Sequence, residues 1–235
     1  MSEQGRTVES VRRANLGSIL GIVHREGPQS RAALTESTGL NRSTVADLVG
    51  ALVSFGLVTE RAPDPSRRVG RPSPVVAVDP AVVAIAVNPE VDALEVAAVG
   101  LDRELRAVVV LPQDHLLTPE RTAELIATQI ATWRRGDLAD ARILGVGLAV
   151  PGLVRIEDGL VRDAPHLGWV DVPLRDLVAA ATGIPVVVGN DATLGTIAEH
   201  LFGAARGIDH AVYLNGGASG IGGGIIVNGM PVVGA

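Results

Sequence analysis

Asn190 and Asp191 are adjacent residues whose types suggest a binding or catalytic site. They follow an apolar run, at the point where a helix is expected to begin. An amide next to a carboxylate suits paired hydrogen bonds to sugar hydroxyls, and the carboxylate could act as a general base toward one hydroxyl. Asn and Asp are also ordinary helix caps. The pair alone therefore leaves open both a sugar site and a purely structural role.

Two further loops are expected at the same edge of a sheet, where ligands bind in open α/β folds. Pro151 and Gly152 follow a nearly all-apolar run, and residues 215–224 are rich in glycine. Backbone N–H groups in the glycine-rich stretch, near Gly216 and Gly217, could approach a phosphate or a sugar oxygen. The stretch lacks the G-K-[ST] ending of a nucleotide phosphate loop and, unlike a dinucleotide-binding motif, leads into no helix.

A different chemistry is expected near the N-terminus, where residues 41–55 predict an amphipathic helix with Asn41 as its N-cap. A shorter helix, residues 30–38, precedes it and ends at Gly39. Two helices joined by a tight turn are typical of the helix-turn-helix motif, whose second helix enters the major groove. An ordinary helical hairpin is the alternative. The polar residues expected to face DNA are Ser30, Arg31, Asn41, Arg42, Ser43 and Thr44.

Within this motif, Arg42, Ser43 and Thr44 would touch base edges and Arg31 would contact a phosphate. Two short strands, residues 57–61 and 73–78, follow the second helix and predict a wing. The turn between them is basic, and a Gly-Arg-Pro sequence suits the insertion of an Arg into a narrow minor groove. A solvated loop is the alternative, but the neighbouring helices favour a winged helix-turn-helix domain over residues 1–79. The arginines of the turn are Arg67, Arg68 and Arg71.

Composition restricts the class of protein. The 235 residues are 47% hydrophobic and only 2% aromatic, so the core is expected to consist of Val, Ala, Leu and Ile. The chain has no cysteine, which excludes disulfides and Cys-based metal sites within it. No signal peptide or membrane-spanning run is present, so we expect a cytoplasmic protein. Residues 1–80 carry ten Arg and eight acidic residues, whereas residues 81–235 carry ten Arg and eighteen, which places the basic excess in the predicted DNA-binding domain.

The pattern changes to α/β after Pro80, and residues 80–235 predict a second domain. Three strand-length apolar runs are followed by alternating helices and strands, which predicts a mixed sheet with helices on its faces. The expected strands are residues 81–87, 94–99, 105–111, 142–150, 185–188, 209–214 and 222–227, and the expected helices are residues 119–135, 173–181 and 192–202.

Together these features resemble the ROK family (repressors, open reading frames, kinases), and specifically its transcriptional regulators. The resemblance covers nearly the whole chain. It implies an actin-like, ribonuclease H-like sugar-kinase fold after the winged helix, with a first lobe at residues 80–205 and the start of a second at 206–235. The segments that carry it, in order, are GRPSPVVAVDP, GVGLAVPGLV followed by EDG, APHLGW, PVVVGND, AEHLFGAA and GIGGGI.

The resemblance also implies functional residues and partners. Asn190 and Asp191 match the family's sugar-binding pair, and Asp191 matches the catalytic base of its kinases. The implied partners are a double-stranded DNA operator, a sugar or sugar-phosphate effector, and further copies of the chain in a homodimer or homotetramer on a near-palindromic site. The same cleft would be lined by Pro151, Gly152, Gly216 and Gly217.

The sequence departs from the family in two places. The kinases grip ATP phosphates with an Asp-x-Gly-Gly-Thr loop, whereas residues 86–92 are AVNPEVD, without glycine and with two acids. This difference argues against kinase activity, so no catalytic residue is predicted. The sequence also ends at Ala235, where the family continues with a His/Cys zinc cluster and most of the second lobe. We therefore expect no cofactor within this chain, zinc only in a complete protein beyond residue 235, and an aggregation-prone chain in which residues 225–227 are uncovered.

The leading hypothesis is a sugar-responsive transcriptional regulator, with a repressor favoured. The alternative is a sugar kinase with a fused DNA-binding head, which glycines at residues 88–92 would have favoured. A third hypothesis is an architectural DNA-binding protein whose sugar site is inactive, and whose operator binding ignores every sugar.

Overall fold

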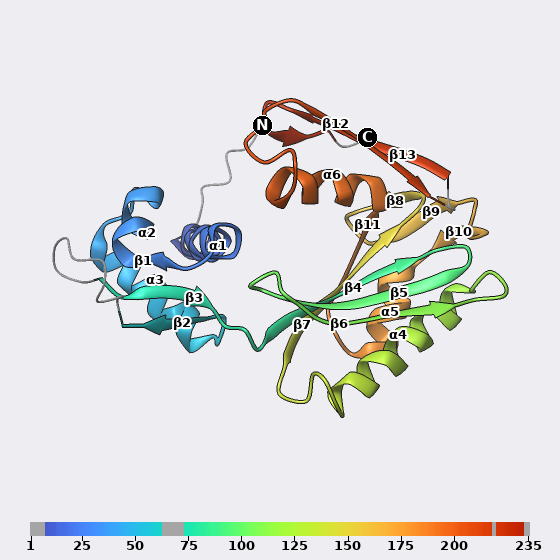
Figure 1. The fold of residues 1–235 in the computed structure, drawn as a ribbon, viewed down its shortest axis with the longest axis horizontal. Helices are drawn as coiled ribbons and strands as arrows, with labels where there is room; N and C mark the ends of the chain where they lie inside the picture. The colour runs from blue at the N-terminus through green and yellow to red at the C-terminus, as the bar shows by residue number, and fades with distance from the viewer. Residues whose placement is uncertain (1–7, 63–72, 218–219, 233–235) are drawn as a thin grey trace. The chain divides into compact units, whose positions relative to one another are not determined.

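The computed structural model describes residues 8–62, 73–217 and 220–232 (Figure 1). The chain divides into two compact units. The first consists of Met1–Val82 together with Leu101–Arg103, and the second of Val83–Gly100 with Glu104–Ala235. The predicted division after residue 79 did not include the short segment Leu101–Arg103 in the first unit.

The first unit contains three helices and a three-stranded antiparallel sheet of order β1-β3-β2. The two helices predicted at residues 30–38 and 41–55 are present, and all three helices pack one apolar side into a common core that includes Ile19, Leu34 and Val49. The two-residue strand β1 was not predicted, since so short a segment has no periodicity. The elements are α1 (Val8–Glu26), β1 (Gln29–Ser30), α2 (Arg31–Thr38), α3 (Arg42–Ser54), β2 (Val58–Arg61) and β3 (Val75–Val78).

Side-chain caps define the tight turn between α2 and α3. Ser30 Oγ accepts the Ala33 N–H at 3.1 Å, and Asn41 Oδ1 accepts the Thr44 N–H at 2.9 Å. Gly39 ends α2 in the left-handed conformation, with φ at 68°, which glycine adopts without a steric penalty. These contacts confirm the predicted cap at Asn41 and the predicted end of α2 at Gly39, whereas the cap at Ser30 was not predicted.

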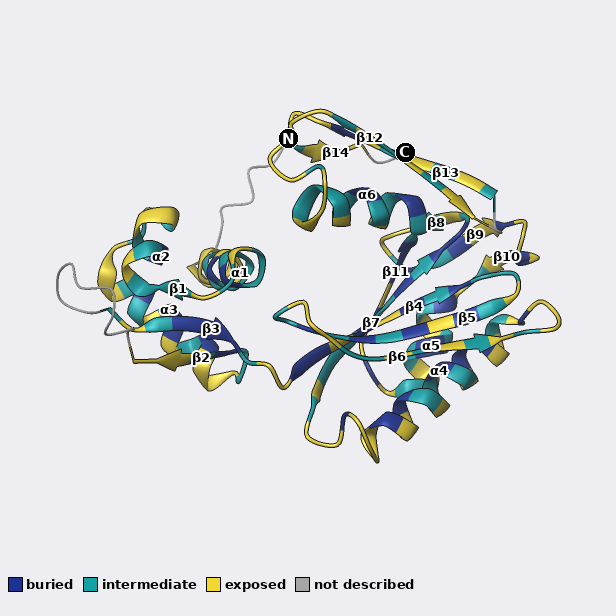
Figure 2. Ribbon diagram, viewed as in Figure 1, coloured by how far each residue is buried: buried dark blue, intermediate teal, exposed yellow. Residues whose placement is uncertain are grey.

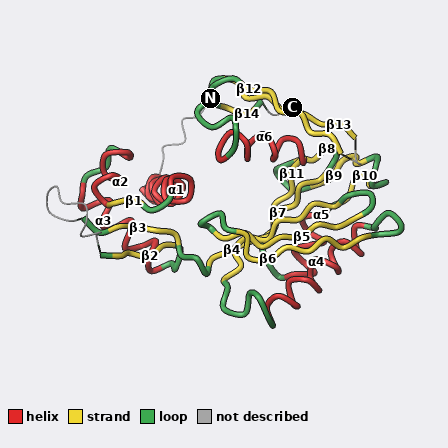
Figure 3. Tube along the Cα trace, viewed as in Figure 1, coloured by secondary structure: helices red, strands yellow, loops and turns green. Residues whose placement is uncertain are grey.

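A five-stranded sheet of order β11-β7-β4-β5-β6 forms the centre of the second unit. Strands β11 and β7 are parallel, whereas β4, β5 and β6 form an antiparallel meander. Helices α4 (Pro119–Arg134) and α5 (Leu174–Thr182) cover one face (Figure 3). The strands are β4 (Val82–Pro89), β5 (Ala93–Gly100), β6 (Leu105–Pro112), β7 (Arg142–Val150) and β11 (Val186–Asn190).

Burial alternates along these strands (Figure 2). Residues such as Val96 and Leu148 point toward α4 and α5 and are fully buried, whereas Val108 and Val187 on the opposite face are 60% and 71% exposed. The near-continuous apolar sequence of β7 suggested cover on both faces. Within the described residues, only the face toward α4 and α5 is fully covered.

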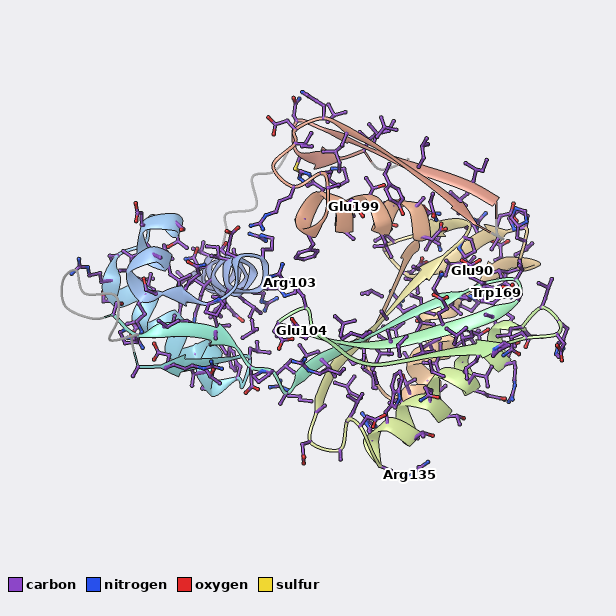
Figure 4. The ribbon with its side chains drawn as sticks, viewed as in Figure 1. Glu90, Arg103, Glu104, Arg135, Trp169 and Glu199 are labelled. Atoms are coloured by element: carbon purple, nitrogen blue, oxygen red, sulfur yellow. The ribbon has the colours of Figure 1, made fainter. Side chains whose placement is uncertain are left out.

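A small antiparallel sheet of order β10-β9-β8 was not predicted. Its strands are β8 (Leu153–Arg155), β9 (Leu160–Ala164) and β10 (Trp169–Val172), which are short and interrupted by polar residues. The buried indole N–H of Trp169 donates to the Leu117 carbonyl at 2.9 Å and ties this sheet to the segment before α4 (Figure 4).

Helix α6 (Asp191–Phe202) packs against a third sheet, of order β12-β13-β14. The glycines of β13 permit this packing. A Cβ at Gly222 would lie 2.8 Å from Ala192 Cβ, and one at Gly224 would overlap Thr196 Oγ1. Much of the glycine-rich stretch is therefore a close helix–sheet contact. The strands are β12 (Ala211–Gly217), β13 (Gly220–Val227) and β14 (Met230–Pro231).

The expectation that residues 225–227 lack cover is wrong for Ile226, which is 1% exposed, because alternate residues of β13 face α6. Its neighbours Ile225 and Val227 point away and are 47% and 43% exposed. Aggregation of the chain stays a prediction. Among the described residues, no helix combines the length and apolar character needed to cross a bilayer.

The contact between α6 and β13 yields a stability prediction. Gly224→Ala should lower the free energy of unfolding by about 1–3 kcal/mol, because the new methyl group must displace Thr196, whose Cβ would lie only 2.8 Å away. Gly217→Ala is the matched control, since a Cβ there meets nothing within 4 Å. Urea denaturation of both variants measures the difference, and equal stabilities would contradict the packing role of Gly224.

Candidate functional site

A cavity of about 730 Å³ lies at the carboxyl ends of β4, β7 and β11. The parallel pairing that places Asn190 beside Val150 brings the loops after β7 and β11 together. All six residues predicted from the sequence to bind sugar lie in its wall: Pro151, Gly152, Asn190, Asp191, Gly216 and Gly217.

Asn190 makes four hydrogen bonds with its side chain. Oδ1 accepts from the backbone N–H of Thr193 at 2.9 Å and from its hydroxyl at 3.1 Å, which caps α6. Nδ2 donates to the Gly152 carbonyl at 3.1 Å and to Asp191 Oδ1 at 2.9 Å. Both roles considered for Asn190 in the sequence are therefore compatible, because the residue caps the helix and also fixes the neighbouring carboxylate.

Asp191 presents a half-buried, oriented carboxylate to the cavity. Its Oδ1 accepts from Asn190, and its Oδ2 accepts from Asn215 Nδ2 at 3.2 Å. A carboxylate oxygen has more than one acceptor position, so each oxygen can still accept a hydrogen bond from a ligand. Such an arrangement can accept hydrogen bonds from the hydroxyl groups of a ligand.

Gly152 lies where only glycine fits, since a Cβ there would come within 2.8 Å of Ala164. Gly216 and Gly217 belong to the paired end of the β12–β13 hairpin, opposite Ile221 and Gly220. The predicted turn beyond them, residues 218–219, lies outside the described residues. Of these three glycines, Gly152 alone is required by its surroundings, since a Cβ at Gly216 or Gly217 would meet nothing within 4 Å among the described residues.

Sequence reasoning missed several residues of the cavity wall. Asn88 and Glu90 follow the first strand and were considered only as the place of an absent phosphate loop, although a polar pair directly after a strand is itself a signal. Within the described residues, no three His, Cys, Asp or Glu side chains gather closely enough to hold a metal ion. The missed residues that line the cavity are Asn88, Glu90, Pro165 and His166, whereas Asn215 lies in the wall as the resemblance implied.

The predicted DNA-contacting residues lie at the starts of α2 and α3. Arg42 is exposed at the first position of α3. Ser43 Oγ donates to Asn41 Oδ1 at 2.7 Å, so this side chain already takes part in the cap, and Thr44 is half-buried. Arg42 is thus the side chain of this turn best placed to reach a base edge.

Arg31 is already paired in this structure. Its Nε and Nη2 each lie 2.6 Å from a carboxylate oxygen of Glu60 on β2, and both side chains are about one-third exposed. A phosphate contact by Arg31 would have to compete with this bidentate pair, which the sequence did not predict. Arg67, Arg68 and Arg71 of the predicted wing tip lie outside the described residues.

The fold and the cavity define a class of protein: a winged helix followed by an actin-like α/β lobe with a sugar-kinase-type cleft. Residues 85–235, more than half of the chain, match the ROK family. The chain belongs to the ROK family.

The named proteins that this chain resembles match it over different lengths. The xylose repressor of Bacillus spizizenii is 31% identical over 222 residues, which cover 93% of this chain and 56% of that protein. The glucokinase of Thermotoga maritima is 43% identical over 90 residues, only 38% of this chain. The chain spans little more than half the length of the repressors it matches.

Two solved structures agree with the fold. A ROK family transcriptional regulator described as a homologue of the E. coli MLC protein superposes over 94% of this chain and 56% of its own, with a TM-score of 0.76 at 23% identity. A ROK family glucokinase from Streptomyces griseus, in complex with glucose and AMPPNP, covers 65% of this chain and 47% of its own, with a TM-score of 0.54 at 29% identity.

The Asn190 network yields a second prediction. Asn190→Asp keeps an oxygen to cap α6 but removes both donor bonds and places a carboxylate next to Asp191. We expect the free energy of unfolding to fall by about 1–3 kcal/mol. Asn228→Asp, the same change at an exposed turn between β13 and β14, is the control. If both variants unfold at the same urea concentration, the donor bonds of Asn190 do not support the site.

Proposed function

We propose that this chain is the DNA-binding and sugar-binding part of a transcriptional repressor that responds to a sugar. The observation that carries the proposal is the extent of the similarity. The alignment with xylose repressors runs over 93% of the chain and therefore through both units, whereas the glucokinase alignments cover 37–48%. The printed names of these repressors make xylose the first effector to test.

In this proposal the winged helix reads one operator half-site, with α3 in the major groove. A single half-site binds weakly against the excess of non-specific DNA, so the chain acts as a homodimer or homotetramer on a near-palindromic site. A sugar in the cavity favours a state of the assembly that binds the operator less tightly. The available coupling is the difference in sugar affinity between the two states, typically about 1–3 kcal/mol.

The kinase alternative has weaker support. Sugar binding by the Asn190–Asp191 pair is shared with it, and the related glucokinase structure carries glucose. However, residues 86–92 contain no glycine to approach ATP phosphates, and Glu90 would repel them. We therefore assign no enzymatic activity, and no cofactor within this chain.

The proposal is tested by operator binding in the presence of sugars. Gel-shift titration of the chain against DNA from its own upstream region should give a specific complex that one sugar of a panel, xylose first, dissociates. Asp191→Asn should keep operator affinity but lose the sugar response, because its amide cannot replace a carboxylate acceptor. Binding that ignores every sugar would favour the architectural alternative, and sugar-dependent ATP turnover would favour the kinase.

The role of α3 is tested separately. Arg42→Ala should weaken specific operator binding by about 1–3 kcal/mol, roughly 5- to 150-fold, because a base-edge contact is lost. Arg121→Ala, an exposed Arg on α4 that pairs with Glu124, is the matched control for loss of charge. Operator affinity that is equal in the two variants would remove Arg42 from the DNA interface.

A further inference from the structure

The wall of the sugar cavity carries more negative than positive charge. Two carboxylates, Glu90 and Asp191, belong to it, and the residues described in the wall include no Arg. The whole chain has no Lys. His166, which is exposed, is the one described side chain of the wall that can carry a positive charge. Even a protonated His166 would leave the wall negatively charged.

Several hydrogen-bond donors of the wall are bonded to its own acceptors. Both Nδ2 hydrogens of Asn190 go to Asp191 and Gly152, and Asn215 Nδ2 donates to Asp191. Asn88 Nδ2 donates to Glu90 Oε1 at 3.0 Å. Pro151 and Pro165 have no N–H group. Carboxylate oxygens have more than one acceptor position, so the acidic residues of the wall suit a ligand that donates hydrogen bonds.

The hydrogen bond that holds Glu90 in position leaves a polar atom of Asn88 without a partner. With Asn88 Nδ2 bonded to Glu90, the Asn88 Oδ1 atom is buried without a hydrogen-bond partner within the described structure. A buried acceptor without a partner is unfavourable. The opposite orientation of the amide would place this oxygen against the Glu90 carboxylate, which is a worse arrangement. The Asn88–Glu90 bond therefore fixes the carboxylate at the end of β4 (Figure 4).

The N-terminus of α6 does not provide a binding site for a phosphate group either. A helix N-terminus normally attracts anions through its free N–H groups and dipole. Here the first residue of α6 is Asp191 itself, and Asn190 Oδ1 already accepts the Thr193 N–H. A phosphate group would meet a carboxylate at the place where other folds offer backbone donors.

We propose that Glu90, together with Asp191, is a specificity-determining residue that excludes phosphorylated sugars, so that the effector is an uncharged sugar. This inference rests on the proposed function, since it concerns the effector of the same cavity. The hydroxyls of an uncharged sugar donate to the two carboxylates. A phosphate monoester offers only acceptors and negative charge, and is repelled by both.

The test compares each sugar with its own phosphate ester. Isothermal titration of the full chain uses D-xylose, D-glucose and N-acetyl-D-glucosamine, each beside its terminal phosphate monoester. We expect an uncharged sugar to bind and its ester to bind at least about tenfold more weakly, a modest ratio for charge repulsion within a protein cavity. Glu90→Gln keeps the acceptor for Asn88 and the size of the side chain. Glu90→Gln should lower the ratio of the ester's Kd to the sugar's Kd by roughly threefold or more, because the ester binds more tightly.

Glu120→Gln, at an exposed position in the first turn of α4, is the matched control and should leave the ratio unchanged. An ester that binds the unchanged protein as well as its sugar would overturn the inference while leaving the proposed function intact. A ratio that Glu90→Gln does not alter would also overturn it, because Glu90 would then take no part in the exclusion. If neither sugars nor esters bind, both the inference and the sugar response of the proposed function are wrong.

Discussion

The Asn190 side chain joins the three segments on which the cavity depends. Its amide oxygen caps α6, while its amide nitrogen bonds the loop after β7 and the carboxylate of Asp191. All of its hydrogen-bonding capacity is used within the protein. The loop after β7, the end of β11 and the start of α6 therefore have one relative position, and Asp191 is oriented before any ligand arrives. Preorganisation of this kind lowers the entropy that a ligand must lose when it binds.

Strands β12 and β13, which also line the cavity, are held beside it by close packing against α6. Ala192 and Thr196 lie against Gly222 and Gly224 without room for a side chain. The same helix thus presents Asp191 at its first turn and holds the hairpin that carries Asn215 and Gly216 along its length. A single helix therefore sets both the carboxylate and the wall opposite to it, which explains why a glycine run that resembles a ligand loop also has a packing role.

Local sequence patterns were sufficient to predict the parts of the fold that depend on interactions between residues close in sequence. The cap Asn41, the glycine that ends α2 and the strand at residues 142–150 were all predicted from neighbouring residue types. The sequence did not reveal the Arg31–Glu60 pair, because its partners are 29 positions apart and meet only when β2 folds beside α2. The small sheet β8–β10 was missed for a related reason, since its strands are stabilised by pairing with each other rather than by their own periodicity. For the cavity, the loops were found, but Glu90 was considered only as a departure from a phosphate loop. The hydrogen bond between Glu90 and Asn88 could be recognised only from the three-dimensional structure.

The segment Leu101–Arg103 restricts how the two units can be separated by recombination. It lies between β5 and β6 in sequence, yet Leu101 packs into the core of the first unit and its carbonyl lies 2.6 Å from His24 Nδ1. The first unit is therefore not contiguous in the gene. A winged helix moved to another protein by recombination near codon 82 would leave part of its hydrophobic core behind. Exchange of DNA-binding heads between relatives would then require compensating changes at Leu16, Leu20 or nearby residues, so inheritance of the two units together is favoured.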